Sequence, residues 1–176
     1  MIVVAGGMIR SGSTFTFNIA RELLALEGSL EWDTANSLIK SVDGYNNYLL
    51  KSHNPDVDII GGILAGDICC ICTIRRPDEA IASWMRTFGF SFEHGLSTIV
   101  TWLEWYSKVE KNVLTIPYFS VEETPRMVIL DIAKYLNINC EASFCDDITE
   151  RYDKSKIKLK YDNLKKEDGT IDVGLS

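Results

Sequence analysis

The stretch GGMIRSGST, residues 6–14, decides how the start of this chain folds. It has the glycine spacing of the phosphate-binding loop G-x-x-x-x-G-K-[ST], with Gly7 and Gly12 as the two glycines. Ser13 occupies the lysine position of that motif, and the positive charge of the stretch is Arg10. The stretch therefore predicts an anion-binding loop without the usual lysine. A glycine–serine turn that caps an ordinary helix is the alternative, because this glycine spacing is common by chance.

The loop lies between a predicted strand and a predicted helix. Residues 2–5 are apolar and mostly β-branched, and residues 14–26 carry apolar side chains at helical spacing. Backbone N–H groups at the N-terminus of such a helix, helped by the hydroxyls of Ser11, Ser13 and Thr14, form a cradle for an anion.

Strands alternate with helices along most of the chain, which predicts an α/β fold with three layers, α/β/α, and a mostly parallel central sheet of the phosphate-loop NTPase kind. We expect a single domain over residues 1–176, with a polar, lysine-rich tail from about residue 153. The expected strands are 2–5, 48–51, 67–74 and 112–118, and the expected helices are 14–26, 56–64, 77–88, 92–111 and a segment around 127–136.

Two details of the topology follow from local patterns. Residues 67–74 are apolar almost throughout, which is typical of a parallel strand covered on both faces, so we expect this strand in the middle of the sheet. Ser120 and Glu123 have the spacing of a capping box and are expected to open the helix around residues 127–136. Because such sheets bind ligands at the carboxyl ends of their strands, the residues that follow each strand form the candidate site.

The composition argues against several classes of partner. With 18 Lys and Arg against 25 Asp and Glu, the formal net charge is −7, which disfavours broad binding to nucleic acids or anionic membranes. The apolar run at the start is too short for a signal peptide, and no stretch approaches the ~20 apolar residues of a membrane span. We therefore expect a cytoplasmic protein whose anion site is local.

The five cysteines form an odd set without the spacing of a disulfide framework, which predicts reduced thiols. Cys69 and Cys72 form a C-x-x-C motif within a β-rich run. Since residues three apart point to opposite faces of a strand, these two are expected to be buried core thiols and not ligands of one metal ion.

Lys51 and His53 follow the second predicted strand. The chain has only two histidines, and an imidazole beside a lysine at a strand end has the position and the ordinary pKa, about 6.5, of a general base. A solvated loop histidine is the alternative.

Arg75 follows the predicted strand 67–74, and Ser83 lies two helical turns further on. The two side chains could hold one phosphate group from two sides, although an ion pair of Arg75 with Asp78 or Glu79 is an equally ordinary arrangement. No acidic residue ends this strand to hold Mg²⁺ with the loop hydroxyl, which disfavours kinase or ATPase chemistry and predicts a site without a metal.

Taken together and in this order, these motifs resemble the sulfotransferases that use 3′-phosphoadenosine-5′-phosphosulfate (PAPS). The family motif [KR]-S-G-[ST]-T is matched by residues 10–14, and K-[ST]-H is matched by residues 51–53. The family turn R-x-P-x-[DE], with a serine on the helix that follows, is matched by Arg75 and Ser83 in RRPDEAIAS. The resemblance runs from residue 2 to about residue 138, and its specificity lies in the ordered set of motifs.

The resemblance implies a role for each matched residue. Residues 10–14 would bind the 5′-phosphosulfate, with Arg10 and Lys51 balancing charge and His53 as the catalytic base. Arg75 and Ser83 would bind the 3′-phosphate. Tyr118 and Phe15 match aromatic residues that approach or stack on the adenine, although both could equally be core aromatics; the donor-binding set is thus Arg10, Ser11, Gly12, Ser13, Thr14, Phe15, Arg75, Ser83 and Tyr118.

The chain departs from the family pattern in three ways. Phe119 stands where an acidic residue usually follows the strand tyrosine, and the family's carboxyl-terminal R-K-G-like turn and G-x-W have no clear counterpart. Lysines between Lys154 and Lys166 could supply charge there, or form a solvated surface. The chain is also short for the family.

The expected activity is transfer of a sulfuryl group from PAPS to a hydroxyl or amine of a small-molecule or carbohydrate acceptor. Two other functions remain open: a phosphate-loop kinase for a small molecule or nucleotide, which would require Mg²⁺ and prefer ATP, and a non-catalytic nucleotide-binding protein. His94 is expected to be structural. Neither the identity of the acceptor nor the oligomeric state follows from the sequence.

Overall fold

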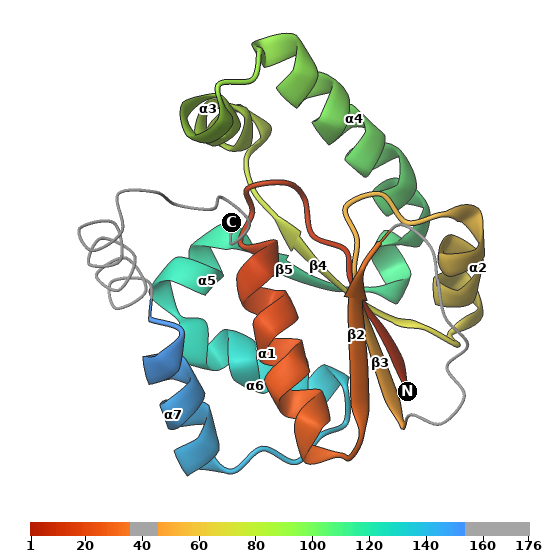
Figure 1. Ribbon diagram of the computed structural model, residues 1–176, viewed down its shortest axis with the longest axis vertical. Helices are drawn as coiled ribbons and strands as arrows, with labels where there is room; N and C mark the ends of the chain where they lie inside the picture. Colours follow the sequence, from red (N-terminus) through yellow and green to blue (C-terminus); the bar gives the residue numbers. More distant parts are fainter. Residues whose placement is uncertain (36–45, 154–176) are drawn as a thin grey trace, which may run out of the picture.

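The computed structural model, which describes residues 1–35 and 46–153, contains a parallel sheet of five strands between two layers of helices (Figure 1). The strand order is β2-β3-β1-β4-β5, and every neighbouring pair is parallel. The predicted three-layer α/β/α fold is therefore confirmed. The strands are β1 (Ile2–Ala5), β2 (Leu30–Thr34), β3 (Asn47–Lys51), β4 (Cys69–Ile74) and β5 (Leu114–Pro117).

The middle strand is β1, and the prediction that residues 67–74 would hold this place is wrong. Strand β4 lies between β1 and β5, with Val4 of β1 opposite Cys70 of β4 and Leu50 of β3. Strands β1, β3 and β4 all have buried, apolar interiors, so apolar character does not distinguish the central strand from its two neighbours. Their order is set by the crossover connections between them.

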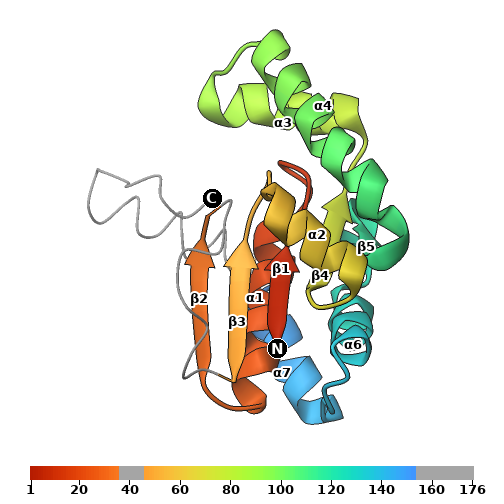
Figure 2. The same ribbon diagram turned by 90° about the vertical axis from the view of Figure 1, so that its right-hand side faces the viewer.

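Helices cover both faces of the sheet, as Figures 1 and 2 show. Helices α1, α6 and α7 pack on one face with Val3, and helices α2 and α4 pack on the other with Val4, because successive strand residues point to opposite faces. The helices are α1 (Ser13–Leu26), α2 (Val57–Ala65), α3 (Pro77–Phe88), α4 (Phe92–Val109), α5 (Tyr118–Glu123), α6 (Pro125–Tyr135) and α7 (Ala142–Arg151), with a short 3₁₀ turn at Glu110–Asn112.

The carboxyl ends of the parallel strands lie at the same end of the sheet. Figure 2 shows α3 and the first part of α4 extending beyond the arrowheads of the strands. Helix α3 begins with Pro77 at its first position and Asp78 and Glu79 in its first turn, as the sequence predicts, since proline has the φ angle of a helix and acidic residues complement the helix dipole. This helix therefore starts directly behind Arg75 at the end of β4.

The predicted capping box at Ser120 is wrong. Ser120 lies inside α5, and α6 starts separately with Pro125 as its first residue and Thr124 as its cap. Proline has no N–H and excludes the helical conformation from the residue before it, so α5 must end where it does. Strand β2 and helices α5 and α7 are elements that the sequence patterns did not indicate.

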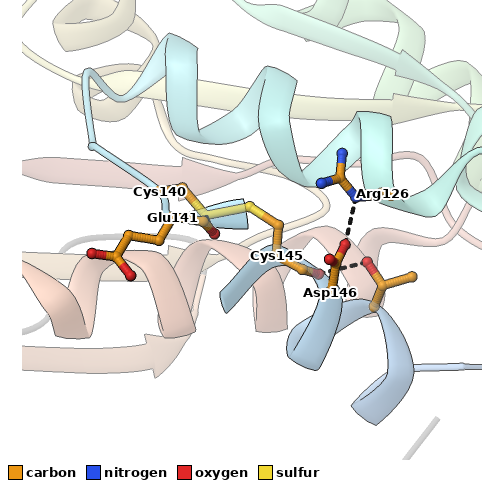
Figure 3. The surroundings of a disulfide bond; sticks show 6 residues. Arg126, Cys140, Glu141, Cys145 and Asp146 are labelled. Atoms are coloured by element: carbon orange, nitrogen blue, oxygen red, sulfur yellow. Dashed lines mark hydrogen bonds and ion pairs between the residues drawn. A yellow bond between two sulfur atoms is a disulfide. The ribbon is translucent and has the colours of Figure 1, made fainter. Parts of the chain in front are cut away.

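The prediction that all cysteines are reduced is also wrong, because the structure joins Cys140 and Cys145 in a disulfide, with Cα atoms 6.6 Å apart (Figure 3). The bond links the segment after α6 to the first turn of α7. Close by, Arg126 of α6 forms an ion pair with Asp146 of α7, with a nitrogen–oxygen distance of 2.6 Å. Sequence patterns did not indicate this pairing, because it depends on the turn that starts α7 at Ala142, between the two cysteines.

The other cysteines lie in β4 as predicted. Cys69 packs with the core of the α1 face, whereas Cys72 is fully buried in the core of the α4 face. The prediction that the C-x-x-C motif points to opposite faces is thus confirmed. Across residues 1–35 and 46–153, no helix has the length and apolar character needed to cross a membrane.

Candidate functional site

A cavity of about 980 Å³ opens at the carboxyl ends of the strands. The parallel sheet brings the ends of β1, β3 and β4 to one edge, so residues far apart in the sequence share this cavity. Every residue of the predicted site lines it except Ser11. The lining residues from that prediction are Arg10, Gly12, Ser13, Thr14, Phe15, Lys51, His53, Arg75, Ser83 and Tyr118.

The loop between β1 and α1 takes its shape from two glycines. Gly12 caps α1 with a φ angle of +87°, a left-handed conformation that glycine adopts without strain. At Gly7 the need is for space, since a Cβ atom there would collide with the Thr73 hydroxyl and lie 2.7 Å from Cβ of Ser13. Close packing against β4 therefore fixes the start of the loop. The left-handed conformation of Gly12 then directs the chain into α1.

Ser11 lies behind the loop and not in the cavity. Its side chain is fully buried, and its hydroxyl lies 2.5 Å from the carbonyl oxygen of Met8 and 2.6 Å from the hydroxyl of Thr73. The Ser11 side chain thus attaches the loop to β4. Ser13 and Thr14, the first residues of α1, are left to face the cavity, where the first N–H groups of a helix have no partner within the helix.

Lys51 ends β3 and contacts the loop. Its ammonium group donates a hydrogen bond of 2.9 Å to the hydroxyl of Thr14, and burial lowers the pKa of Lys51. Register explains this contact, because Lys51 is opposite Ala5, the last residue of β1 before the loop. Lys51 of the neighbouring strand β3 therefore provides, at the loop, the lysine that the loop itself lacks.

His53 has its two ring nitrogens in different environments. Its Nδ1 lies 2.6 Å from the carbonyl oxygen of Gly7, and since a carbonyl only accepts, Nδ1 carries the proton and Nε2 has a lone pair. Burial lowers the pKa of His53, the bond to Gly7 raises it and the charge of Lys51 lowers it further. The net decrease keeps the imidazole neutral near pH 7, which a proton acceptor requires.

Arg10 spans the loop and the helix α3. Its φ angle is +57°, and its guanidinium donates hydrogen bonds of 3.2 Å to the hydroxyls of Ser83 and Thr87. The same group lies 5.4 Å from the ring centre of Phe88. Helix α3 thus holds Arg10 at the cavity through two hydroxyls and one aromatic ring.

Arg75 pairs with Glu79, as one of the alternatives drawn from the sequence anticipated. The distance from its Nε to the carboxylate is 3.1 Å, while Nη1 donates to the carbonyl oxygen of Arg10 at 3.2 Å. Its guanidinium lies 4.1 Å from the ring centre of Tyr118. Arg75 therefore braces the left-handed residue of the loop and remains part of the cavity wall.

The cations of the cavity repel one another. Burial lowers the pKa of Arg10, the nearby Tyr118 raises it, and the charge of Arg75 lowers it. Lys51 likewise lowers the pKa of His53. An anion bound among these groups would relieve the repulsion.

Two tryptophans of α4 support the loops from the other side of the sheet. The indole N–H of Trp102 donates to the carbonyl oxygen of Gly6 at 2.7 Å, and that of Trp105 donates to the carbonyl oxygen of His53 at 3.1 Å. Both rings are buried. Helix α4 thereby fixes the backbone at both the loop and the histidine, a role that the sequence did not reveal.

The structure adds two groups of lining residues that the motifs did not contain. Helix α3 and the residues after it contribute Trp84, Arg86, Phe88 and Phe90, and the end of α7 contributes Tyr152 and Asp153. The aromatic cluster FGF at residues 88–90 was a visible signal for the first group. No local pattern marks the second, since α7 reaches the cavity only through its packing on α1 and α6.

Three further features drawn from the sequence are His94, Phe119 and the lysines of the tail. His94 lies in the first turn of α4, with its ring centre 4.8 Å from that of Phe90. The Phe119 side chain is exposed on α5. The lysines between Lys154 and Lys166 lie outside the described residues. Within the described part of the chain, no three His, Cys, Asp or Glu side chains are grouped so that they could hold a metal ion.

Comparison with solved structures identifies proteins with this architecture. The chain is similar to mouse sulfotransferase SULT7A1 complexed with PAP, with a TM-score of 0.62 and 14% identity over 90% of this chain. It is similar to retinol dehydratase in complex with androsterone and inactive cofactor PAP, with a TM-score of 0.62 and 13% identity over 85% of this chain. Identities this low establish a shared fold and nothing further.

The chain spans 65% of the length of the first of these proteins and 62% of the second. No protein-family model and no curated protein sequence matches it.

Proposed function

We propose that this protein is a sulfotransferase that moves a sulfuryl group from PAPS to a hydroxyl or amine of an acceptor. The observation that carries the proposal is that His53, with its Nδ1 bonded to the carbonyl oxygen of Gly7, shares one cavity with Arg10, Lys51 and Arg75. A donor with a sulfonated 5′-phosphate and a separate 3′-phosphate needs two anion sites. The cavity offers two groups of anion-binding residues for them, which lie on different elements, and each group contains at least one cation.

The first group would hold the 5′-phosphosulfate. It consists of the backbone at the start of α1, the hydroxyls of Ser13 and Thr14, and the side chains of Arg10 and Lys51. Helix N-termini bind anions through N–H groups and the helix dipole. The second group, Arg75 and Ser83, would hold the 3′-phosphate, with Phe15 and Tyr118 beside the base.

The mechanism assigned to this chain is an in-line transfer. His53 accepts the acceptor's proton at Nε2 while Nδ1 stays bonded to Gly7, which fixes the tautomer and the orientation of the ring. Lys51 and Arg10 balance the negative charge that grows on the departing phosphate. Such a reaction depends mainly on positioning and on charge stabilisation, as phosphoryl transfer does.

The experiment that tests the proposal is calorimetric titration with PAP, adenosine 3′,5′-bisphosphate, in the presence and absence of Mg²⁺. We expect binding that does not depend on Mg²⁺ and that ATP with Mg²⁺ displaces weakly, because Arg75 and Ser83 recognise a 3′-phosphate that ATP lacks. Arg75→Ala should weaken PAP binding by about tenfold or more, as expected for the loss of a charge-assisted contact to phosphate.

Arg76→Ala is the matched control, because the Arg76 side chain is exposed, pairs with Asp78 and does not line the cavity. It should leave PAP affinity unchanged. Stronger binding of ATP with Mg²⁺ than of PAP would reject the sulfotransferase assignment in favour of a kinase. Tight PAP binding without transfer to any acceptor would leave a non-catalytic nucleotide-binding protein.

A further inference from the structure

One wall of the cavity takes no part in the donor contacts proposed above. It is formed by the rings of Trp84, Phe88 and Phe90, called here the aromatic wall, and by the neighbouring Arg86. These residues belong to α3 and to the turn between α3 and α4, which extend beyond the strand ends in Figure 2. His53 lines the same cavity, so a molecule on this wall would share the space with the proposed base.

The aromatic wall is an assembled surface. The ring centre of Trp84 lies 6.0 Å from that of Phe88 and 5.7 Å from that of Phe90, and the two phenylalanine rings are 6.0 Å apart. Behind them, His94 lies 4.8 Å from Phe90. Phe88 and Phe90 are nevertheless 37% and 45% exposed, so the cluster presents ring surface that residues 1–35 and 46–153 leave uncovered. Such rings favour a flat apolar or aromatic ligand.

Arg10 joins this wall to the donor end of the cavity. Its guanidinium lies 5.4 Å from the Phe88 ring while its Nε bonds to Ser83. A ring placed on the aromatic wall is therefore close to the group that would hold the donor's phosphosulfate. This proximity is what an acceptor site requires, because the accepting oxygen must meet the sulfur in line.

Arg86 gives the wall a chemical preference. It lies in the last turn of α3, lines the cavity, and makes no hydrogen bond or ion pair with any residue in the described ranges. The other arginines of this region are engaged, Arg75 with Glu79 and Arg76 with Asp78. A guanidinium that borders an aromatic surface and has no partner among the described residues can form a bidentate pair with a carboxylate or similar anion.

We propose that the acceptor is an aromatic hydroxyl compound that carries an anionic group, bound with its ring against the aromatic wall and its anion at Arg86. This inference rests on the proposed function and specifies its acceptor. In the transfer, the aryl oxygen forms a bond to sulfur as the bond between sulfur and the bridging phosphate oxygen breaks. The aryl proton passes to Nε2 of His53, and the electron pair of the broken bond leaves with the phosphate of PAP.

A neutral carbohydrate suits the wall less well. Sugars need several hydrogen-bonding side chains around an aromatic platform. On α3, which carries two of the three rings, the Thr87 hydroxyl donates to the carbonyl oxygen of Ser83, and the charged side chain that lines the cavity is Arg86. The combination selects for a ring and one charge.

The test measures binding to the protein saturated with PAP, by calorimetry, using 3-(4-hydroxyphenyl)propanoate and its neutral amide. The acid should bind about tenfold or more tightly than the amide, because only the acid forms the charge-assisted pair. Arg86→Gln should remove this preference and leave the affinity for the amide nearly unchanged. Phe90→Ala should weaken both compounds alike, because it removes ring surface.

Lys108→Gln is the control, since it removes one positive charge from the exposed side of α4 without touching the cavity. Its preference for the acid should equal that of the unsubstituted protein. Equal affinity for the acid and the amide, or an unchanged preference for the acid in Arg86→Gln, would overturn the acceptor inference. If PAP still binds in that case, the proposed function is not affected. Absence of PAP binding would overturn the proposed function itself. In that case, a preference for the acid over the amide that depends on Arg86, measured without PAP, would still support a site for an anionic aryl compound.

Discussion

The pKa of His53 depends on its burial and on two neighbours, Gly7 from the loop after β1 and Lys51 at the end of β3. Burial lowers its pKa most, the carbonyl of Gly7 raises it, and the ammonium of Lys51 lowers it. A low pKa suits the proposed role of His53, because a general base must be neutral before it accepts a proton. The same geometry explains why the loop does not need its own lysine, because Lys51 reaches Thr14 from the neighbouring strand.

We predict that His53 titrates below the ordinary value of 6.5. The unfolded chain then binds more protons than the folded one between the two pKa values, so folded stability should decline as pH falls below about 6.5 and level off below the folded pKa. NMR titration of the imidazole signals measures the pKa, and denaturant unfolding from about pH 5 to 8 measures the stability.

The assignment of the signals is simple, because the chain has two histidines and His94→Gln removes the other one. His53→Gln should flatten the pH dependence of stability. A His53 pKa at or above 6.5, or a dependence that survives this substitution, would show that the imidazole is not held neutral by its surroundings.

At the scale of single elements, the loop between β1 and α1 depends on space behind Gly7. An alanine Cβ would collide with the hydroxyl of Thr73 and crowd Ser13. We expect Gly7→Ala to lower the free energy of unfolding by about 1–3 kcal/mol, as overpacking does, and to weaken PAP binding because Ser13 lines the anion site. Denaturant unfolding and calorimetry measure the two effects.

Gly61→Ala provides the comparison for that substitution. Gly61 lies within α2, where an added Cβ would meet nothing within 4 Å. Alanine should there leave PAP binding unchanged and raise stability by up to about 1 kcal/mol, since alanine favours helix over glycine. Equal effects of the two alanines would refute the claim that crowding behind the loop shapes the anion site.

The elements that the sequence predicted correctly are those with a strong local pattern. β1, β3 and β4 are short apolar runs, and α3 has proline at its start with acidic residues next to it. Parallel strands bring their carboxyl ends together, so the motifs after these strands could be expected in one cavity. The strand order could not be read in the same way, because three strands are equally apolar.

What the sequence did not predict depends mostly on contacts between distant elements. The approach of Tyr152 to the cavity requires α7 to pack on α1. The pairing of Cys140 with Cys145 is local, but it depends on the turn into α7, and no sequence pattern marked that helix. Edge strand β2 has partly buried and exposed side chains and none that is fully buried, so it lacks an apolar signature. In each case the deciding information lies in packing and not in local periodicity.

At the scale of the whole molecule, the site belongs to both layers of helices. The start of α1, on one face of the sheet, forms part of the proposed anion site. Helix α4, on the other face, bonds to the backbone of Gly6 through Trp102 and to that of His53 through Trp105. Helix α4, which carries both tryptophans, comes directly after the aromatic wall in the sequence. The pair of helices α3 and α4 therefore connects the proposed base with the proposed acceptor surface.

The last prediction tests this support from across the sheet. Trp105→Phe keeps an aromatic ring but removes the N–H that bonds to the carbonyl of His53. Leaving that acceptor without a partner should cost about 1–3 kcal/mol of unfolding free energy. Because the segment that carries His53 loosens and admits water, the His53 pKa should also rise toward 6.5. PAP affinity should change little, because the Trp105 indole bonds to the His53 carbonyl and not to the proposed phosphate-binding side chains. Trp32→Phe, at a ring that is 51% exposed on β2, is the control and should leave the His53 pKa as it is. A His53 pKa that stays low in Trp105→Phe would mean that β3 and the Gly7 carbonyl alone position the base, and that α4 contributes to folding without contributing to the site.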